Sequence, residues 1–155
     1  EDYKKLMLKL NNEVVAAAPE DLLINTHVCR GNYHSTFFSS GAYDSVADLL
    51  FGEENVNAYY LEYDDERSGG FAPLAKVSGD KKVVLGLVTT KTPVLENKEL
   101  VINRIHEAAK YVPLDRLYLS PQCGFASCEI GNKLTEEEQW AKLKLVKEIA
   151  EEVWG

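Results

Sequence analysis

The sequence predicts an α/β fold in which four parallel βα units form the C-terminal half of a TIM (β/α)8 barrel. Short apolar runs alternate with amphipathic stretches of helical spacing along the chain. Strands that alternate with helices belong to parallel sheets, whose strands are buried on both faces. Four units are half of an eight-unit barrel, and 155 residues fall short of the roughly 200 that a full barrel needs. We therefore expect residues 1–155 to form a single domain.

The first half of the chain supplies two of these units. Residues 2–17 have apolar positions at helical spacing, and residues 22–28 (LLINTHV) form a compact apolar strand. Residues 43–51 again show helical spacing, and Gly52 is typical of a residue that ends a helix. Residues 58–63 (AYYLEY) are the second predicted strand.

The second half repeats this alternation. It is predicted to contain a short helix at 71–77, strands at 82–90 and 116–120, and longer helices at 98–111 and 135–153. The run KVVLGLVTT is rich in β-branched residues, which favour strands. Thr135 followed three residues later by Glu138 predicts a capping box at the start of the last helix.

Composition excludes several classes of protein. Asp and Glu number 25 and Lys and Arg 17, which gives a formal net charge of −8. An acidic chain without a basic run is a poor match for a nucleic-acid partner. No apolar stretch approaches the roughly 18–20 residues that cross a bilayer, so we expect no membrane partner. The three cysteines are too few and too widely spaced for a disulfide framework, which favours a cytoplasmic location.

Four side chains that can bind a metal stand at the ends of predicted strands. His27 and Cys29 are two residues apart, so both side chains point to the same face. Glu62 ends the next strand and Cys123 follows the last one. The carboxyl ends of the strands meet on one rim of a barrel, and thiolates with an imidazole favour zinc. The alternative is that the cysteines are apolar core residues and His27 is a hydrogen-bonded core residue.

Four segments give the chain a resemblance to the cobalamin-independent methionine synthase family, within the wider group that contains uroporphyrinogen decarboxylase. They are THVCRGN (26–32), LEYDDERSG (61–69), LVTTKTPVLE (87–96) and LSPQCGF (119–125). The resemblance runs from about residue 20 onward and is closer to the short, single-barrel members than to the long enzymes. It implies a zinc ion bound by a His-x-Cys pair, a Glu on the next strand and a Cys after a Pro. These map onto His27, Cys29, Glu62 and Cys123.

The resemblance also implies a reaction, which is methyl transfer to the thiol of homocysteine to form methionine. Zinc would hold that thiol as a thiolate, and the donor would be a 5-methyltetrahydrofolate. Where the long enzymes carry an Asp and a His two residues apart, this chain has Thr89 and Lys91. Lys91 is therefore expected either to act as the catalytic acid or to bind a substrate carboxylate.

Other polar residues near the strand ends are candidates for substrate binding. Arg30 and Asn32 flank the ligand pair and could hydrogen bond to the ligands or to the substrate. Glu96 could bind substrate or cap the next helix. Cys128 is expected to be a structural thiol, and it is the substitute ligand if Glu62 is not one.

The resemblance places the folate contacts and most amino-acid contacts before this half, so the chain alone is expected to hold zinc without completing a turnover. Open sheet edges predict that it self-associates or pairs with the missing N-terminal half. Two alternatives stay open. One is a methyltransferase with another thiol acceptor or a methyl-corrinoid donor, and the other is a non-catalytic zinc-binding half-domain. Zinc hydrolysis is disfavoured because two thiolates reduce the Lewis acidity that water activation needs.

Overall fold

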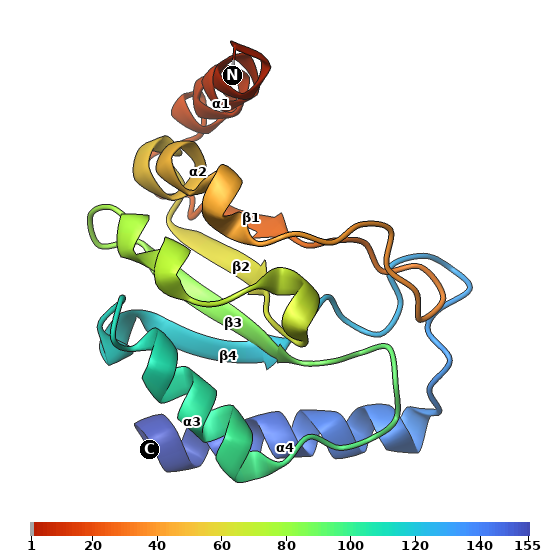
Figure 1. Ribbon diagram of the computed structural model, residues 1–155. Coiled ribbons are helices and arrows are strands. Elements are labelled where there is room, and N and C mark those ends of the chain that lie inside the picture. Colours follow the sequence, from red (N-terminus) through yellow and green to blue (C-terminus); the bar gives the residue numbers. More distant parts are fainter. Residues whose placement is uncertain (1) are drawn as a thin grey trace.

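The computed structural model describes residues 2–155 and has a four-stranded parallel sheet at its centre (Figure 1). The strands are β1 (Asn25–Val28), β2 (Ala58–Glu62), β3 (Lys82–Val88) and β4 (Leu117–Pro121). Each strand pairs in parallel with the next one along the chain, in the order β1-β2-β3-β4. The prediction of four parallel strands alternating with helices is confirmed.

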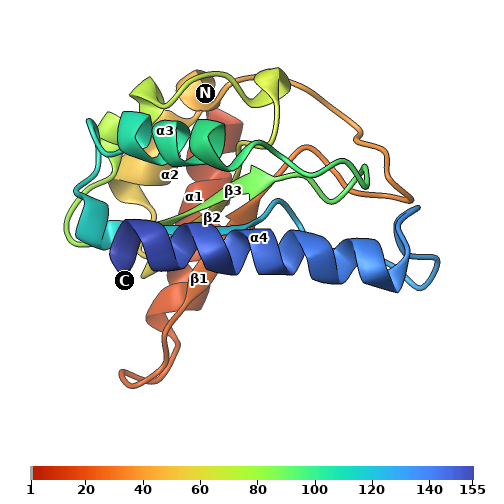
Figure 2. The same cartoon turned by 90° about the horizontal axis from the view of Figure 1, so that it is seen from below.

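Residues 2–155 also form four α-helices and four short 3-10 helices, which precede, connect and follow these strands. The α-helices are α1 (Asp2–Ala16), α2 (Ala47–Glu53), α3 (Lys98–Ala108) and α4 (Glu136–Trp154). The 3-10 helices are η1 (Tyr43–Ser45), η2 (Glu66–Ser68), η3 (Ala72–Lys76) and η4 (Leu114–Arg116). Helices α3 and α4 pack against each other beside β3 and β4, and α1 lies next to α2 at the other end of the sheet (Figures 1 and 2). Within residues 2–155 no helix is long and apolar enough to cross a bilayer.

Several predicted boundaries change in the structure. The capping box is present, because Thr135 accepts a hydrogen bond from the Glu138 amide and Glu138 accepts one from the Thr135 amide. The prediction that Gly52 ends a helix was wrong, since α2 continues through it to Glu53. The strand predicted at 22–28 begins at Asn25, because β2 offers its first pairing position there.

One face of the sheet carries the hydrophobic core. Alternate side chains of the strands point to the helices and are fully buried, among them Tyr59, Leu61, Val83, Leu85 and Leu117. Helical residues that include Phe51, Ile105 and Ile149 complete this core. Its packing fixes the register of the strands, and therefore fixes which residues appear at their carboxyl ends.

The opposite face of the sheet is open. His27, Tyr60, Val84 and Tyr118 form one row across it, because the pairing register places each beside the next. Tyr60 and Tyr118 are 40% and 41% exposed. This row leads to the carboxyl ends of the strands, where the predicted metal ligands gather.

Candidate metal centre

Three metal-binding side chains meet at the carboxyl end of the sheet. His27 lies in β1, Cys29 follows the end of β1, and Cys123 follows the end of β4. The Nε2 atom of His27 is 3.3 Å from the sulfur of Cys123, and the ligand atoms of all three lie within 4.8 Å of one another. We refer to these three residues as the donor cluster. Since β1 and β4 are the opposite edges of the sheet, the sheet must curve for these atoms to meet.

The chemistry of the donor cluster fits a zinc ion. Sulfur and imidazole nitrogen are ligands that zinc favours, and three protein ligands leave a position for a substrate. Among residues 2–155, these are the His, Cys, Asp and Glu residues whose ligand atoms gather this closely in a group of three or more. Cys128 is a free thiol outside that group.

Burial controls the charge of the donor cluster. Desolvation raises the pKa of the Cys123 thiol well above its usual range, and the neighbouring Cys29 raises it further, against an opposing effect of Lys91. Desolvation also lowers the pKa of His27, against the attraction of Glu62. At neutral pH the imidazole is therefore in its neutral, metal-binding form. The Cys123 thiol is protonated, and a metal must displace that proton.

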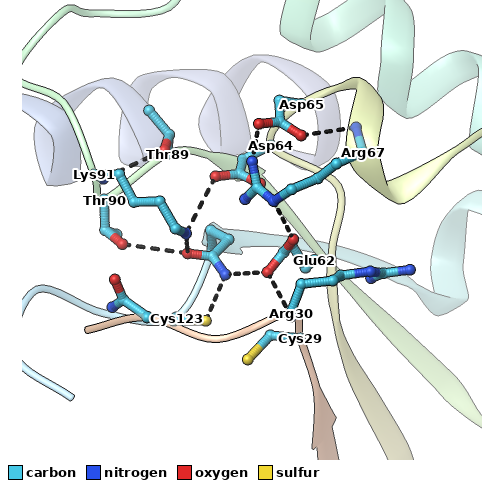
Figure 3. A network of polar contacts seen from close by, with 12 residues as sticks. Cys29, Arg30, Glu62, Asp64, Asp65, Arg67, Thr89, Thr90, Lys91 and Cys123 are labelled. Carbon is cyan, nitrogen blue, oxygen red and sulfur yellow. Dashed lines mark hydrogen bonds and ion pairs between the residues drawn. The ribbon is translucent and has the colours of Figure 1, made fainter. Parts of the chain in front are cut away.

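The Glu62 carboxylate is fully buried at the end of β2, beside the donor cluster but outside it. Its Oε1 atom lies 2.9 Å from Nε of Arg67 and accepts a hydrogen bond from the Ser68 hydroxyl. Its Oε2 atom accepts a hydrogen bond from the Arg30 amide, at 3.0 Å (Figure 3), and another from the side chain of Gln122. A metal bound by Oε2 would therefore replace one of these donors.

Glu62 belongs to a closed set of charged and polar side chains. We refer to this set, which consists of Glu62, Asp64, Arg67, Lys91 and Gln122, as the charge ring. Arg67 pairs with Glu62 and, at 2.8 Å, with Asp64. The Lys91 Nζ atom lies 3.8 Å from Asp64 (Figure 3) and 2.6 Å from Oε1 of Gln122. Gln122 closes the ring by donating to Glu62. Two positive and two negative side chains make the ring neutral.

Three predicted substrate ligands are engaged within the protein. The Arg30 guanidinium lies 4.0 Å from the Tyr43 ring centroid and donates to the Gly41 carbonyl. Asn32 donates to the carbonyl of Gly124. Glu96 accepts a hydrogen bond from the Thr89 amide and pairs with the buried Lys142. Their roles toward a substrate stay predictions.

The loops that carry the donor cluster are fastened to each other. We refer to the contacts of Asn32, His34 and Ser35 with residues 124–133 as the loop clasp. Asn132 donates to Oδ1 of Asn32 at 3.0 Å and to the Thr90 carbonyl at 2.7 Å, and it accepts from the Ser35 amide at 3.1 Å. His34 and Ser35 have positive φ angles of 45° and 65°, which non-glycine residues seldom adopt. The clasp therefore holds a strained turn while it joins the two outer strands.

The sequence interpretation gave no role to Arg67 or Gln122, and it expected Asp64 to lie in an acidic loop that is mostly solvated, with one carboxylate able to orient His27 or bind an amino group. Asp64 follows Glu62 by two residues, so a strand continued past β2 places both on the same side of the sheet. Gln122 stands directly before a predicted ligand. These positions were visible in the sequence, but the ring depends on how β2, β3 and β4 lie beside one another.

Comparison with known proteins gives the chain its context. Residues 9–152 match the family model described as the catalytic domain of cobalamin-independent synthase. The uncharacterized protein YxjG of Bacillus subtilis is 53% identical over 155 residues, which cover 99% of this chain and 41% of that protein. A methionine synthase of Methanothermobacter marburgensis is 35% identical over 77 residues, which cover 50% of this chain and 23% of that protein.

A solved structure shows the same arrangement. A Listeria monocytogenes protein provisionally assigned as a vitamin-B12-independent methionine synthase has a TM-score of 0.75 and 42% identity, over 98% of this chain and 41% of that one. The prediction of TIM-barrel-type βα units is confirmed by this likeness. The chain thus spans about two fifths of YxjG and of this solved chain.

Proposed function

The chain belongs to the family of cobalamin-independent methionine synthase catalytic domains, and from that premise we propose that it carries the zinc site of a homocysteine methyltransferase. The observation that carries the proposal is the donor cluster, in which His27, Cys29 and Cys123 bring their ligand atoms within 4.8 Å of one another. Glu62 is proposed as the fourth ligand, because its carboxylate shares the Gln122 donor with Cys123.

In this proposal a bound zinc ion supplies a positive centre that keeps a substrate thiol deprotonated and nucleophilic at neutral pH. The protein residues do the rest of the work. His27, kept neutral by burial, and the two cysteines would hold the ion, and Cys123 would give up its proton on binding it. Two cysteine thiolates keep the ion electron-rich, so that a thiolate beside it stays reactive.

The acceptor is proposed to be homocysteine and the product methionine, with a 5-methyltetrahydrofolate as the methyl donor. Lys91 lies within the charge ring next to the donor cluster, so its proposed part in catalysis is to position the groups around the metal rather than to contact the substrate. Arg30, Asn32 and Glu96 remain proposed substrate contacts, each of which would have to give up an internal partner to act directly.

We also propose that residues 1–155 form one unit that pairs with the rest of a barrel, or with a second copy when alone. The open face with Tyr60 and Tyr118 and the unpaired outer edges of β1 and β4 support this. Three free cysteines fit a reducing, cytoplasmic location. Light scattering at micromolar concentration tests the pairing. A dimer is expected, and a stable monomer would contradict it.

The experiment that tests the function uses the whole chain loaded with Co²⁺ in place of zinc. Homocysteine is expected to strengthen the sulfur-to-cobalt charge-transfer absorption, because a further thiolate reaches the metal. Methionine, which has no thiol, is expected to leave the spectrum unchanged. His106→Gln, in α3 and outside the donor cluster, is the control variant. If cobalt binds but its spectrum does not change with homocysteine, the chain is a metal-binding module only. If cobalt does not bind, the proposal is overturned.

A further inference from the structure

Gln122 is the member of the charge ring that also contacts the donor cluster, and it is almost fully buried. Its amide has two N–H donors and one carbonyl acceptor. The nitrogen donates to Oε2 of Glu62 and to the sulfur of Cys123, and the oxygen accepts from Nζ of Lys91 at 2.6 Å. Every hydrogen-bonding group of this side chain is therefore in use.

The partners of Gln122 allow one orientation of its amide. A flipped amide would place its oxygen against the Glu62 carboxylate and the Cys123 sulfur, and its N–H groups against the Lys91 ammonium. The contacts with the carboxylate and with the ammonium would both be unfavourable, whereas each is a hydrogen bond in the observed orientation. Lys91, itself beside Asp64, thus decides which end of the amide faces the donor cluster.

The backbone below Gln122 leaves room for this arrangement because residue 86 is glycine. A Cβ atom at Gly86 would lie 2.7 Å from the Leu61 carbonyl oxygen and 3.0 Å from the Cα atom of Gln122. Both distances are shorter than ordinary contacts, so any side chain there would push β2, β3 and Gln122 apart. Gln122 is therefore held by packing against the sheet as well as by its hydrogen bonds.

Building on the proposed zinc site, we propose that Gln122 is a positioning residue of the metal centre and that Lys91 acts through it. The Gln122 N–H draws electron density from the Cys123 sulfur and fixes its direction, while the same amide holds Glu62. Hydrogen bonds to ligands set the affinity and electronic character of metal sites. The Lys91 side chain is only 7% exposed, so it has little surface to offer a substrate directly.

The test is a Co²⁺ titration of the whole chain and four variants. Gln122→Met is expected to bind about 10–100-fold more weakly, as when an outer partner of a ligand is removed. Its sulfur-to-cobalt band should move to lower energy, because the sulfur loses a donor. Lys91→Met should move the band in the same direction, and the double variant should equal Gln122→Met, because the two act as a unit. Gln139→Met, in α4, should match the wild type.

An unmoved band in a cobalt-binding Gln122→Met protein would overturn this inference while leaving the proposed function intact. Additive effects in the double variant would show that Lys91 does not act through Gln122. Gln122→Glu keeps the shape but loses both donors, so it should reproduce the shift if Gln122→Met fails to fold.

A second measurement needs no metal and separates the two proposals. In the metal-free protein, the side-chain amide NMR signals of Gln122 should move in Lys91→Met and stay fixed in Lys147→Met, whose lysine pairs on the surface with Glu151. Gln122 signals that do not move in Lys91→Met would overturn the inference that Lys91 acts through Gln122. Failure of the wild type to bind cobalt would instead count against the proposed function.

Discussion

The donor cluster and the charge ring lie side by side above one sheet, yet they are built in opposite ways. The donor cluster comes from the outer strands β1 and β4, and its side chains are partly accessible. The charge ring comes from β2, β3 and β4, and its charged side chains are at most 8% exposed. The first group presents ligand atoms to a metal, and in the second each charged side chain has an oppositely charged partner.

This difference separates two roles in the site, which are metal binding and the positioning of the metal ligands. Residues that bind must stay accessible, so they add little to folding stability. Residues that position are buried and paired, so removing one leaves its partner uncompensated. Variants of the ring should therefore lose stability first, and variants of the cluster should lose metal first.

The largest effect on stability is expected at Arg67. Arg67→Met leaves the buried Glu62 carboxylate without its cation and removes one of the two cations beside Asp64, which should reduce the free energy of unfolding by about 3–5 kcal/mol. Urea denaturation of the metal-free protein measures it. The control is Lys9→Met, which removes an exposed pair with Glu13 and should cost under about 0.5 kcal/mol. Equal losses of unfolding free energy in Arg67→Met and Lys9→Met would contradict the claim that the charge ring is the more stabilising region.

A smaller loss is expected where the ring meets the sheet. Gly86→Ala places a methyl group against the Leu61 carbonyl and Gln122, which should cost about 1–3 kcal/mol through overpacking. Gly70→Ala is the matched control, because no atom lies within 4 Å of its added Cβ. Thermal unfolding of both variants gives the comparison. An unchanged melting temperature in Gly86→Ala would mean that Gln122 does not pack against the strands.

The loop clasp is expected to make a moderate contribution to the free energy of unfolding and to support metal binding. Asn132→Ala removes hydrogen bonds to Asn32, Ser35 and Thr90, for a loss of about 1–2 kcal/mol. Because the clasp joins the loops that carry the donor cluster, cobalt affinity should fall as well. Asn103→Ala, exposed in α3, is the control for both measurements. Unchanged cobalt affinity would show that the donor cluster holds together without the clasp.

A last expected effect concerns metal affinity alone, and it is a pH dependence specific to the donor cluster. The raised pKa keeps the Cys123 thiol protonated at neutral pH, so a bound metal displaces its proton. Metal affinity should therefore rise with pH, by about tenfold per unit from this thiol alone between about pH 6 and pH 8. Competition titrations at several pH values measure the slope. Cys128→Ser should keep it, and a flat profile would contradict the assignment of Cys123.

Local sequence pattern predicted the parts of this molecule that depend on local rules. The spacing of His27 and Cys29 follows from the period of a strand, and the capping box at Thr135 follows from neighbouring residues. Gly52 failed because tertiary packing extends α2 by two residues beyond the predicted end at 51. Local propensity does not encode such packing.

The charge ring could not be predicted in the same way. It requires Lys91 after β3 and Gln122 after β4 to lie beside Asp64 after β2, which depends on strand register and loop path. The same limit applies to Arg30, whose side chain turns to Tyr43 rather than to the donor cluster. Proximity to a ligand in sequence does not fix the direction of a long side chain.

The most direct test of the central claim is zinc content by elemental analysis of the wild type, Cys123→Ser and Cys128→Ser. The donor cluster predicts about one zinc per chain in the wild type and in Cys128→Ser, and a large loss in Cys123→Ser. Neither substitution changes a residue of the charge ring, so a difference in zinc content should not come from a loss of folding stability. Zinc that survives in Cys123→Ser, or that disappears in Cys128→Ser instead, would contradict the site described here.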